Sequence, residues 1–343
     1  MKHKIKCLLF TLLLCSCEEV QHMPESFSTI GEILVKNELA VTTTARSSAS
    51  KDAFALGDKI YLYGYSKLLP ADTIGARFMP AAAGTIGTVY EYEKDQDGWH
   101  RFQRPQIPGD QEMGFWRTKQ YHDFTAYYLE NEPLSPDFKC EMGPTGLPKE
   151  DLLWGNITNV YFSGETHIVP KIMFKHQLSR IKVEVMHDME NITAEDFEIR
   201  EFKFKLDKSE ETFNLETGKW KNPKVEEHLI IETFTPLVMD TFPKLTFVEI
   251  ADLWVLPDCT ISDFEFSITQ KGEDKDFYID FESLFNGNDN GDPATIITKP
   301  GYITVLQIKF GDIKQIIFTV SLKPWEVEKK TGAIEDRDID IPL

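Results

Sequence analysis

The residues of this chain that could do chemistry are few, and most of them suggest modification or processing rather than catalysis. The clearest is Cys17, which ends the sequence Leu14-Cys15-Ser16-Cys17. A small residue before the cysteine lets a peptidase cut there, after which the thiol can be acylated. This pattern is typical of a bacterial lipoprotein. The alternative is an ordinary signal peptide with an incidental cysteine.

The sixteen residues before this cysteine have the features of an export signal. Three lysines lie within the first six residues, and an apolar run over 7–15 is too short to cross a bilayer as a helix. We therefore expect residues 1–16 to be a signal peptide and Cys17 to anchor the protein to the outer membrane at the cell surface. Glu18 and Glu19 resemble the acidic pair that marks surface-exported lipoproteins in some diderm bacteria.

Two further stretches could carry a site. Residues 42–51, TTTARSSASK, are small and polar and predict an exposed loop with Arg46 at its centre. Residues 286–292, NGNDNGD, place side-chain oxygens at Asn288, Asn290 and Asp292, the alternate spacing of a calcium loop. The bidentate glutamate of an EF-hand is missing there. A polar turn is the preferred interpretation, and we predict no metal and no cofactor.

Catalytic signatures are missing from the sequence, which has no HExxH, P-loop or GxSxG motif, and we predict no enzyme. Acidic residues are so abundant that choosing two as a glycosidase pair would be arbitrary. His176 lies on the apolar side of its segment and is interpreted as a core histidine rather than a ligand. Cys140 and Cys259 could form a disulfide in an oxidising compartment, but we expect two unpaired thiols.

Charge excludes one class of partner. The formal net charge is −19, and removing residues 1–16 makes it −22, because three lysines and no acidic residues are lost. Such a surface repels nucleic acid and anionic membrane faces, so we expect neither as a partner. The six tryptophans could stack sugars if they were exposed. In a sheet-rich protein, however, tryptophans are expected in the core.

The segments that must position these residues are predicted to be strands. In Asp151–Val185, Ile172, Phe174 and His176 alternate with lysines, and the parity slips near Ser179, which indicates a bulge or bend. We find no convincing amphipathic helix and expect Pro133–Pro148 to be a loop. Further strands are predicted at Ile30–Val41, Lys59–Tyr65, Phe124–Leu129, Phe197–Leu206, Leu245–Val255, Phe264–Gln270, Tyr302–Phe310 and Gln315–Leu322. Many short strands at regular spacing predict antiparallel sandwiches.

Taken in order, these features resemble the fimbrillin superfamily, the Mfa-like lipoproteins that build type V pili. The matching pieces are Cys17, Phe54–Asp58, Trp99 and Trp116 before Phe124–Tyr128, Asp151-Leu152-Leu153, Phe174–Arg180, Pro300-Gly301-Tyr302 and Pro324-Trp325. The resemblance covers nearly the whole chain after Cys17.

The resemblance implies two tandem transthyretin-like Greek-key β-sandwich domains, at 54–168 and 169–343, after a tether and first strand at 17–53. It also implies assembly with other pilus subunits by strand exchange, in which a protease cuts after an arginine and the first strand leaves. Arg46 is the candidate cleavage site. The candidate donor strand is at the end of the chain, where four apolar residues lie: Ile334, Ile339, Ile341 and Leu343. The other expected function is that of a surface lipoprotein that binds glycans without polymerising.

Overall fold

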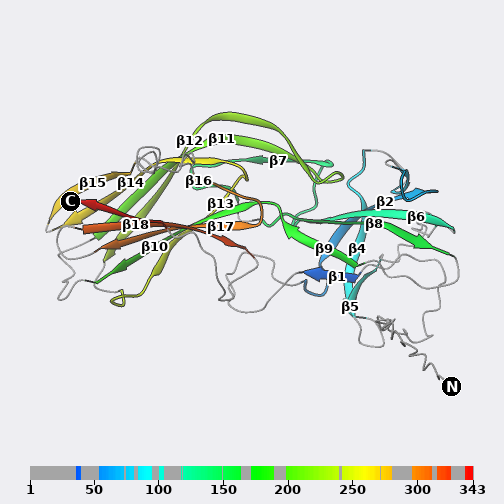
Figure 1. Cartoon of the computed structure of the whole chain (residues 1–343), viewed down its shortest axis with the longest axis horizontal. Coiled ribbons are helices and arrows are strands. Elements are labelled where there is room, and N and C mark those ends of the chain that lie inside the picture. Colours follow the sequence, from blue (N-terminus) through cyan, green and yellow to red (C-terminus); the bar gives the residue numbers. More distant parts are fainter. Residues whose placement is uncertain are drawn as a thin grey trace, which may run out of the picture.

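The computed structural model describes residues 36–39, 54–72, 75–80, 84–94, 100–103, 117, 119–148, 150–163, 171–188, 198–238, 242–270, 272–279, 296–310, 315–325 and 337–342. Every regular element in these ranges is a β-strand, so the predicted all-β class is confirmed. The molecule is elongated, with one sheet at one end and two sheets at the other (Figure 1). Its division into two sandwich domains stays a prediction.

The first sheet has eight strands in the order β1-β9-β8-β6-β2-β4-β5, with β3 also paired to β2. Its two edge strands, β1 and β5, lie side by side, so the sheet curls round on itself. The strands are β1 (Lys36–Leu39), β2 (Lys59–Lys67), β3 (Ala76–Met79), β4 (Thr88–Lys94), β5 (His100–Gln103), β6 (Gln120–Tyr128), β8 (Leu153–Phe162) and β9 (Lys171–His176).

Both faces of this sheet are apolar where its central strands lie. In β2, Ile60 and Leu62 belong to one buried cluster, whereas Tyr61 and Tyr63 belong to another. Successive side chains of a strand point to opposite faces, so the alternation assigns the two clusters to the two faces. We call the face of Ile60 and Leu62 the inner face and the face of Tyr61 and Tyr63 the outer face.

Two further sheets form the other end of the molecule. One has the order β13-β10-β17-β18-β19, and the other has the order β12-β11-β14-β15, with β16 paired to β14 and β7 to β11. The strands are β7 (Asp137–Glu141), β10 (Ser179–His187), β11 (Glu198–Asn214), β12 (Lys219–Val238), β13 (Val248–Val255), β14 (Thr260–Gln270), β15 (Glu273–Ile279), β16 (Ile296–Ile297), β17 (Tyr302–Phe310), β18 (Gln315–Pro324) and β19 (Arg337–Pro342).

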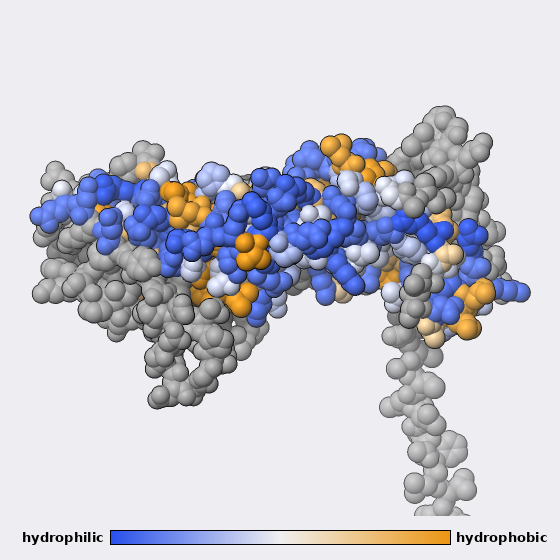
Figure 2. Space-filling view, turned by 90° about the horizontal axis from the view of Figure 1, so that it is seen from above, coloured by the Kyte–Doolittle hydropathy of each residue, from blue (hydrophilic) through white to orange (hydrophobic). Residues whose placement is uncertain are grey.

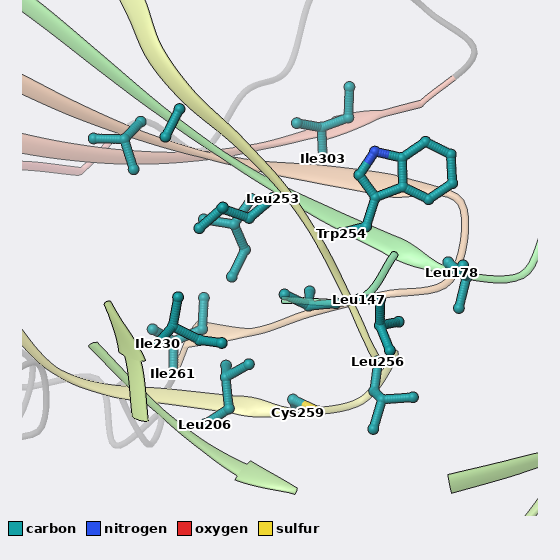
Figure 3. Close-up of a cluster of buried hydrophobic side chains, with 14 of the residues drawn as sticks. Leu147, Leu178, Leu206, Ile230, Leu253, Trp254, Leu256, Cys259, Ile261 and Ile303 are labelled. Carbon is teal, nitrogen blue, oxygen red and sulfur yellow. The ribbon is translucent and has the colours of Figure 1, made fainter. Parts of the chain in front are cut away.

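These two sheets share a core of aliphatic and aromatic side chains. Leu206 and Ile261 from one sheet and Leu253 and Ile303 from the other belong to the same buried cluster (Figure 3). At the surface, hydrophilic residues dominate the view in Figure 2, and the hydrophobic ones form small separate groups.

The structure corrects two sequence expectations. The expected boundary at 168/169 assigned Lys171–His176 to the second half, but β9 pairs with β8 and β1, so the chain changes sheets between His176 and Ser179. Pro133–Pro148, expected as a loop, contains β7, which pairs with β11 in register from Glu210 to Asn214. Each of these pairings joins segments that the sequence analysis assigned to different parts of the chain.

The long hairpin of β11 and β12 extends from the second half of the molecule to the first sheet. Its tip lies on the outer face of the first sheet, where the Trp154 indole N–H donates to the Leu215 carbonyl at 3.0 Å. The Thr125 hydroxyl donates to the Glu216 carbonyl at 3.1 Å, and the Glu216 carboxylate pairs with Arg77. Gly218, with φ of 67°, lies so close to the Trp154 ring that an added Cβ would stand 2.4 Å from it.

Candidate assembly site

The first strand is the last hydrogen-bonded strand at one edge of the first sheet. β1 runs parallel to β9, with Lys36 opposite Lys171 and Leu39 opposite Phe174 (Figure 1). The predicted strand at Ile30–Val41 is therefore present over Lys36–Leu39, and Ile33, Val35 and Val41 lie outside the described residues. Parallel ladders are slightly less stable per residue than antiparallel ones, so this edge is held less firmly than a hairpin edge would be.

The strand that receives β1 belongs to the inner core. Ile172 and Phe174 of β9 are fully buried, and the Phe174 ring meets Phe54 at 5.3 Å and 72°. Phe54 in turn meets Tyr128 at 5.6 Å. Because β1 lies between β9 and β5, it closes the curled sheet over this core. Removing it would leave the outer edge of β9 unpaired beside apolar side chains.

The predicted processing and lipidation residues cannot be placed. Arg46 and Cys17 both lie outside the described residues, as does the loop at 286–292 with its three oxygen donors. Arg46 falls in the segment between the end of β1 at Leu39 and the start of the described sheet at Phe54. A cut there would separate β1 from the rest of the chain.

The candidate donor strand is found as β19, paired antiparallel with β18 in its own sheet. Ile339 lies opposite Phe318 and Ile341 opposite Ile316, at the sheet edge. Ile334 and Leu343 lie outside the described residues. The predicted extended conformation is thus present over Arg337–Pro342, and in the single chain this strand completes its own sheet.

A buried polar and aromatic cluster lies where β9 leads into β10. His176 is 6% exposed, and its Nδ1 lies 2.9 Å from Asp151 Oδ1. The imidazole stacks on the Trp325 indole with ring centroids 4.3 Å apart and planes 4° apart. The interpretation of His176 as a satisfied core histidine therefore holds. We call Asp151, His176, Arg180, Asp252, Trp254 and Trp325 together the junction cluster.

The charged part of the junction cluster is also buried. The Arg180 guanidinium makes two contacts with the Asp252 carboxylate, and Nε donates to Oδ1 at 2.9 Å. Its central carbon lies 5.0 Å from the centroid of Trp325 and 5.9 Å from that of Trp254. The cluster joins the end of β9 to Trp325, the residue from which the C-terminal segment continues. It is a buried polar cluster and holds no reactive group at the surface.

The two cysteines in the described part of the chain are both buried. Cys140 and Cys259 are free and buried, as expected, and burial raises the pKa of each thiol to about 12. Among the described residues, no group of three or more His, Cys, Asp or Glu side chains could hold a metal ion. In these same ranges, no helix is long and apolar enough to cross a membrane.

Sequence reasoning missed the hairpin contact on the first sheet. Glu216 lies in the turn that joins β11 to β12. Nothing in the local pattern shows that this turn reaches Arg77 and Trp154, residues more than sixty positions earlier. Trp254 is fully buried and Trp325 is 6% exposed, which excludes both as sugar-stacking platforms.

Comparison with known proteins gives independent evidence for the family of this chain. A family model described as fimbrillin-like matches residues 43–325. No curated protein sequence matches the chain. The crystal structure of a candidate cell adhesion protein from Bacteroides ovatus is similar, with 13% identity, a TM-score of 0.51, and coverage of 88% of this chain and 100% of that one.

Two other solved structures are similar at lower scores. One is a candidate cell adhesion protein from Bacteroides uniformis, with 15% identity, a TM-score of 0.47, and coverage of 86% and 98% of the two chains. The other is a fimbrial assembly protein from Parabacteroides distasonis, with 10% identity, a TM-score of 0.40, and coverage of 84% and 94%. At such identities, the Bacteroides ovatus likeness shows the fold alone.

Proposed function

The chain belongs to the fimbrillin-like family, and we propose that it is a cell-surface pilus subunit, in the shaft or at an adhesive tip, that assembles by strand exchange after proteolysis. The observation that carries the proposal is β1, a four-residue strand that pairs only with β9 among the described strands, at the edge that closes the first sheet. A segment containing Arg46 separates it from Phe54.

Energetics explain why proteolysis would be needed. Each aliphatic side chain that fills the inner core would contribute about 1.5–3 kcal/mol, and each ladder hydrogen bond about 0.5–1.5 kcal/mol. While β1 remains attached, it re-forms these contacts faster than a separate strand can compete. Cutting after Arg46 makes β1 a separate peptide, and an incoming strand with alternating apolar residues then offers the same contacts to β9.

The proposed donor is the C-terminal strand of a neighbouring subunit. Its residues at 339 and 341 alternate with Asp340 and Pro342, as one buried and one exposed face require. In the single chain this strand is β19, at the edge of its own sheet. It must therefore leave β18 before it can be donated, and the partner of each subunit is another copy or a related pilus subunit.

Membrane attachment is a second part of the proposal. We infer that Cys17 carries the acyl group that holds the subunit at the outer membrane before assembly. Cys17→Ala should release the protein from the membrane fraction, and mass spectrometry of the wild type should find an acylated Cys17. An alanine variant that stays bound, with no acyl group on the wild type, would refute the anchor.

The assembly proposal is tested by limited digestion with a trypsin-like protease and gel electrophoresis without boiling. The wild type should form a ladder of polymers. Arg46→Ala should abolish the ladder, and so should deletion of residues 334–343. Arg200→Ala is the matched control, because Arg200 is a partly exposed arginine on β11, far along the chain from the predicted cut. Cleaved protein that stays monomeric at high concentration would contradict a shaft role.

A further inference from the structure

We propose that the outer face of the first sheet, beyond the hairpin tip, binds neutral glycans. This face carries a row in which Lys67, Tyr121 and Tyr161 stand side by side on β2, β6 and β8. The next positions along β8 on the same face are Thr158 and Asn156, both exposed. We call Tyr121, Tyr161, Asn156 and Thr158 the tyrosine ledge.

A β-bulge aims Tyr161 outward. Along β8, Leu153 and Ile157 face the inner core, so strict alternation would turn residue 161 inward as well. Instead the register shifts between His122 and Phe124 of the partner strand, and Asn159 adopts φ of 60°. The Asn159 N–H donates to Asp123 Oδ1 at 2.8 Å, which pins the bulge.

As a result, Phe162 is buried in the inner core and Tyr161 is 44% exposed. A bulge that re-aims a single side chain is a recurrent feature beside functional sites. Without the bulge in β8, strict alternation would bury Tyr161 and expose the more apolar Phe162. The chain thus accepts an irregular ladder in order to present a tyrosine.

The two rings of the ledge form a stacking surface. The Tyr121 and Tyr161 centroids are 4.9 Å apart, and their planes meet at 48°. Rings at this angle present two faces in different directions, which suits the apolar C–H faces of successive sugar units. Asn156 offers an amide donor and acceptor, and Thr158 offers a hydroxyl, so hydrogen-bonding groups flank the rings.

Charge decides which glycans fit. The Lys67 ammonium lies 2.8 Å from the Asp123 carboxylate, with side-chain exposures of 7% and 22%, so the two charges on this face compensate each other. The Lys67–Asp123 pair therefore adds no net charge beside the ledge, on a chain whose formal net charge is −19. An acidic glycan would be repelled by the whole molecule and would find no free cation in the Lys67–Asp123 pair to compensate. A neutral oligosaccharide is not repelled by the net charge and needs no compensating cation.

The test measures binding of maltohexaose, mannohexaose and xylohexaose to the full chain by saturation-transfer NMR and calorimetry, with hexagalacturonate as the acidic comparison. At least one neutral hexasaccharide should bind, and Tyr161→Ala and Tyr121→Ala should each weaken it about tenfold. Tyr161→Phe should retain most of the affinity, because the ring remains. Tyr302→Ala is the matched control, since Tyr302 is 37% exposed on β17 in the other half of the molecule.

Several outcomes would overturn the proposal. These are binding of none of the three neutral probes, unchanged affinity in Tyr161→Ala, or tighter binding of hexagalacturonate. A Tyr161→Ala variant that alters self-association in analytical ultracentrifugation, without any glycan effect, would identify the ledge as a contact between copies instead. Thermal unfolding of each variant checks that the exposed substitutions leave the fold intact. None of these results depends on strand exchange, so the assembly proposal stands or falls separately.

Discussion

Replacing Asp252 with alanine should destabilise this protein by about 3–5 kcal/mol, because the change removes the Asp252 carboxylate from the buried Arg180 guanidinium. The Arg180 side chain is 3% exposed and that of Asp252 is 10% exposed. The pair lies in the junction cluster, with Arg180 over the rings of Trp254 and Trp325. Water can therefore not reach the guanidinium to replace the lost carboxylate.

An exposed pair of the same chemistry provides the control. Arg200 and Asp274 lie 2.9 Å apart, with side-chain exposures of 37% and 61%. Pairs of this kind contribute about 0–1 kcal/mol, and screening by salt reduces even that. Asp274→Ala should therefore change the unfolding free energy by less than about 1 kcal/mol. Replacing both buried partners, as Arg180→Met with Asp252→Leu, should recover much of the stability, because the ion pair is then removed as a whole.

The assay is equilibrium urea unfolding followed by tryptophan fluorescence. Trp254 and Trp325 report directly on the junction, since their centroids lie 5.9 and 5.0 Å from the central carbon of the guanidinium. Measurements at low and high sodium chloride separate the two pairs, because salt screens the exposed pair much more strongly. If Asp252→Ala and Asp274→Ala differ by less than about 1 kcal/mol, the argument from burial is wrong.

Three other changes have distinct readouts. Burial lowers the pKa of His122, so the unfolded chain binds the proton first, and stability should fall as pH drops below about 6.5; His122→Gln should lessen this loss between pH values of about 7.5 and 5.5. Ellman's reagent should react with Cys140 and Cys259 only after unfolding, and a fast reaction in the native state would contradict their burial. Gly218→Ala should cost about 1–3 kcal/mol from strain and overlap with the indole beneath it, and clearly more than Gly272→Ala, whose φ is 78° but whose Cβ would meet nothing within 4 Å.

Local patterns in the sequence were enough to identify most strands of the second half. Tyr302–Phe310 is β17 as predicted, and its partner β18 begins at the predicted Gln315. The strand predicted at Phe264–Gln270 is also confirmed as part of β14, which pairs with the neighbouring β15 so that Phe266 lies opposite Phe277. These elements depend on alternation within one strand and on the short turn beside it. Both are properties of neighbouring residues, so they can be recognised without knowing the rest of the fold.

Pairing between distant segments could not be predicted in the same way. β7 looked like a loop because Pro133–Pro148 is rich in turn residues, yet Asp137–Glu141 adds a strand to β11. β9 looked like the start of the second half, because its alternation continues almost without a break into β10. Which edge a strand joins depends on the surfaces available in the folded chain, and those surfaces are not encoded in its own alternation.

The tyrosine ledge shows the same limit at the level of one residue. From the sequence, Tyr161 is simply one residue of a strand, and only the tryptophans, which were expected in the core, were considered as sugar platforms. The bulge at Asn159 depends on a hydrogen bond to Asp123 across two strands. Only after that contact forms does the side chain of Tyr161 point outward.

The sequence by itself determined the all-β class, the family and the order of the motifs that end in Trp325. The tertiary structure decided that Asp151, His176, Arg180 and Trp325 form one cluster at the junction. The physical reason is the range of the interactions. Side-chain alternation is imposed by the backbone of each strand, whereas stacking and ion pairing act over a few ångströms between residues up to 149 positions apart, from His176 to Trp325. Such contacts exist only once the chain has folded.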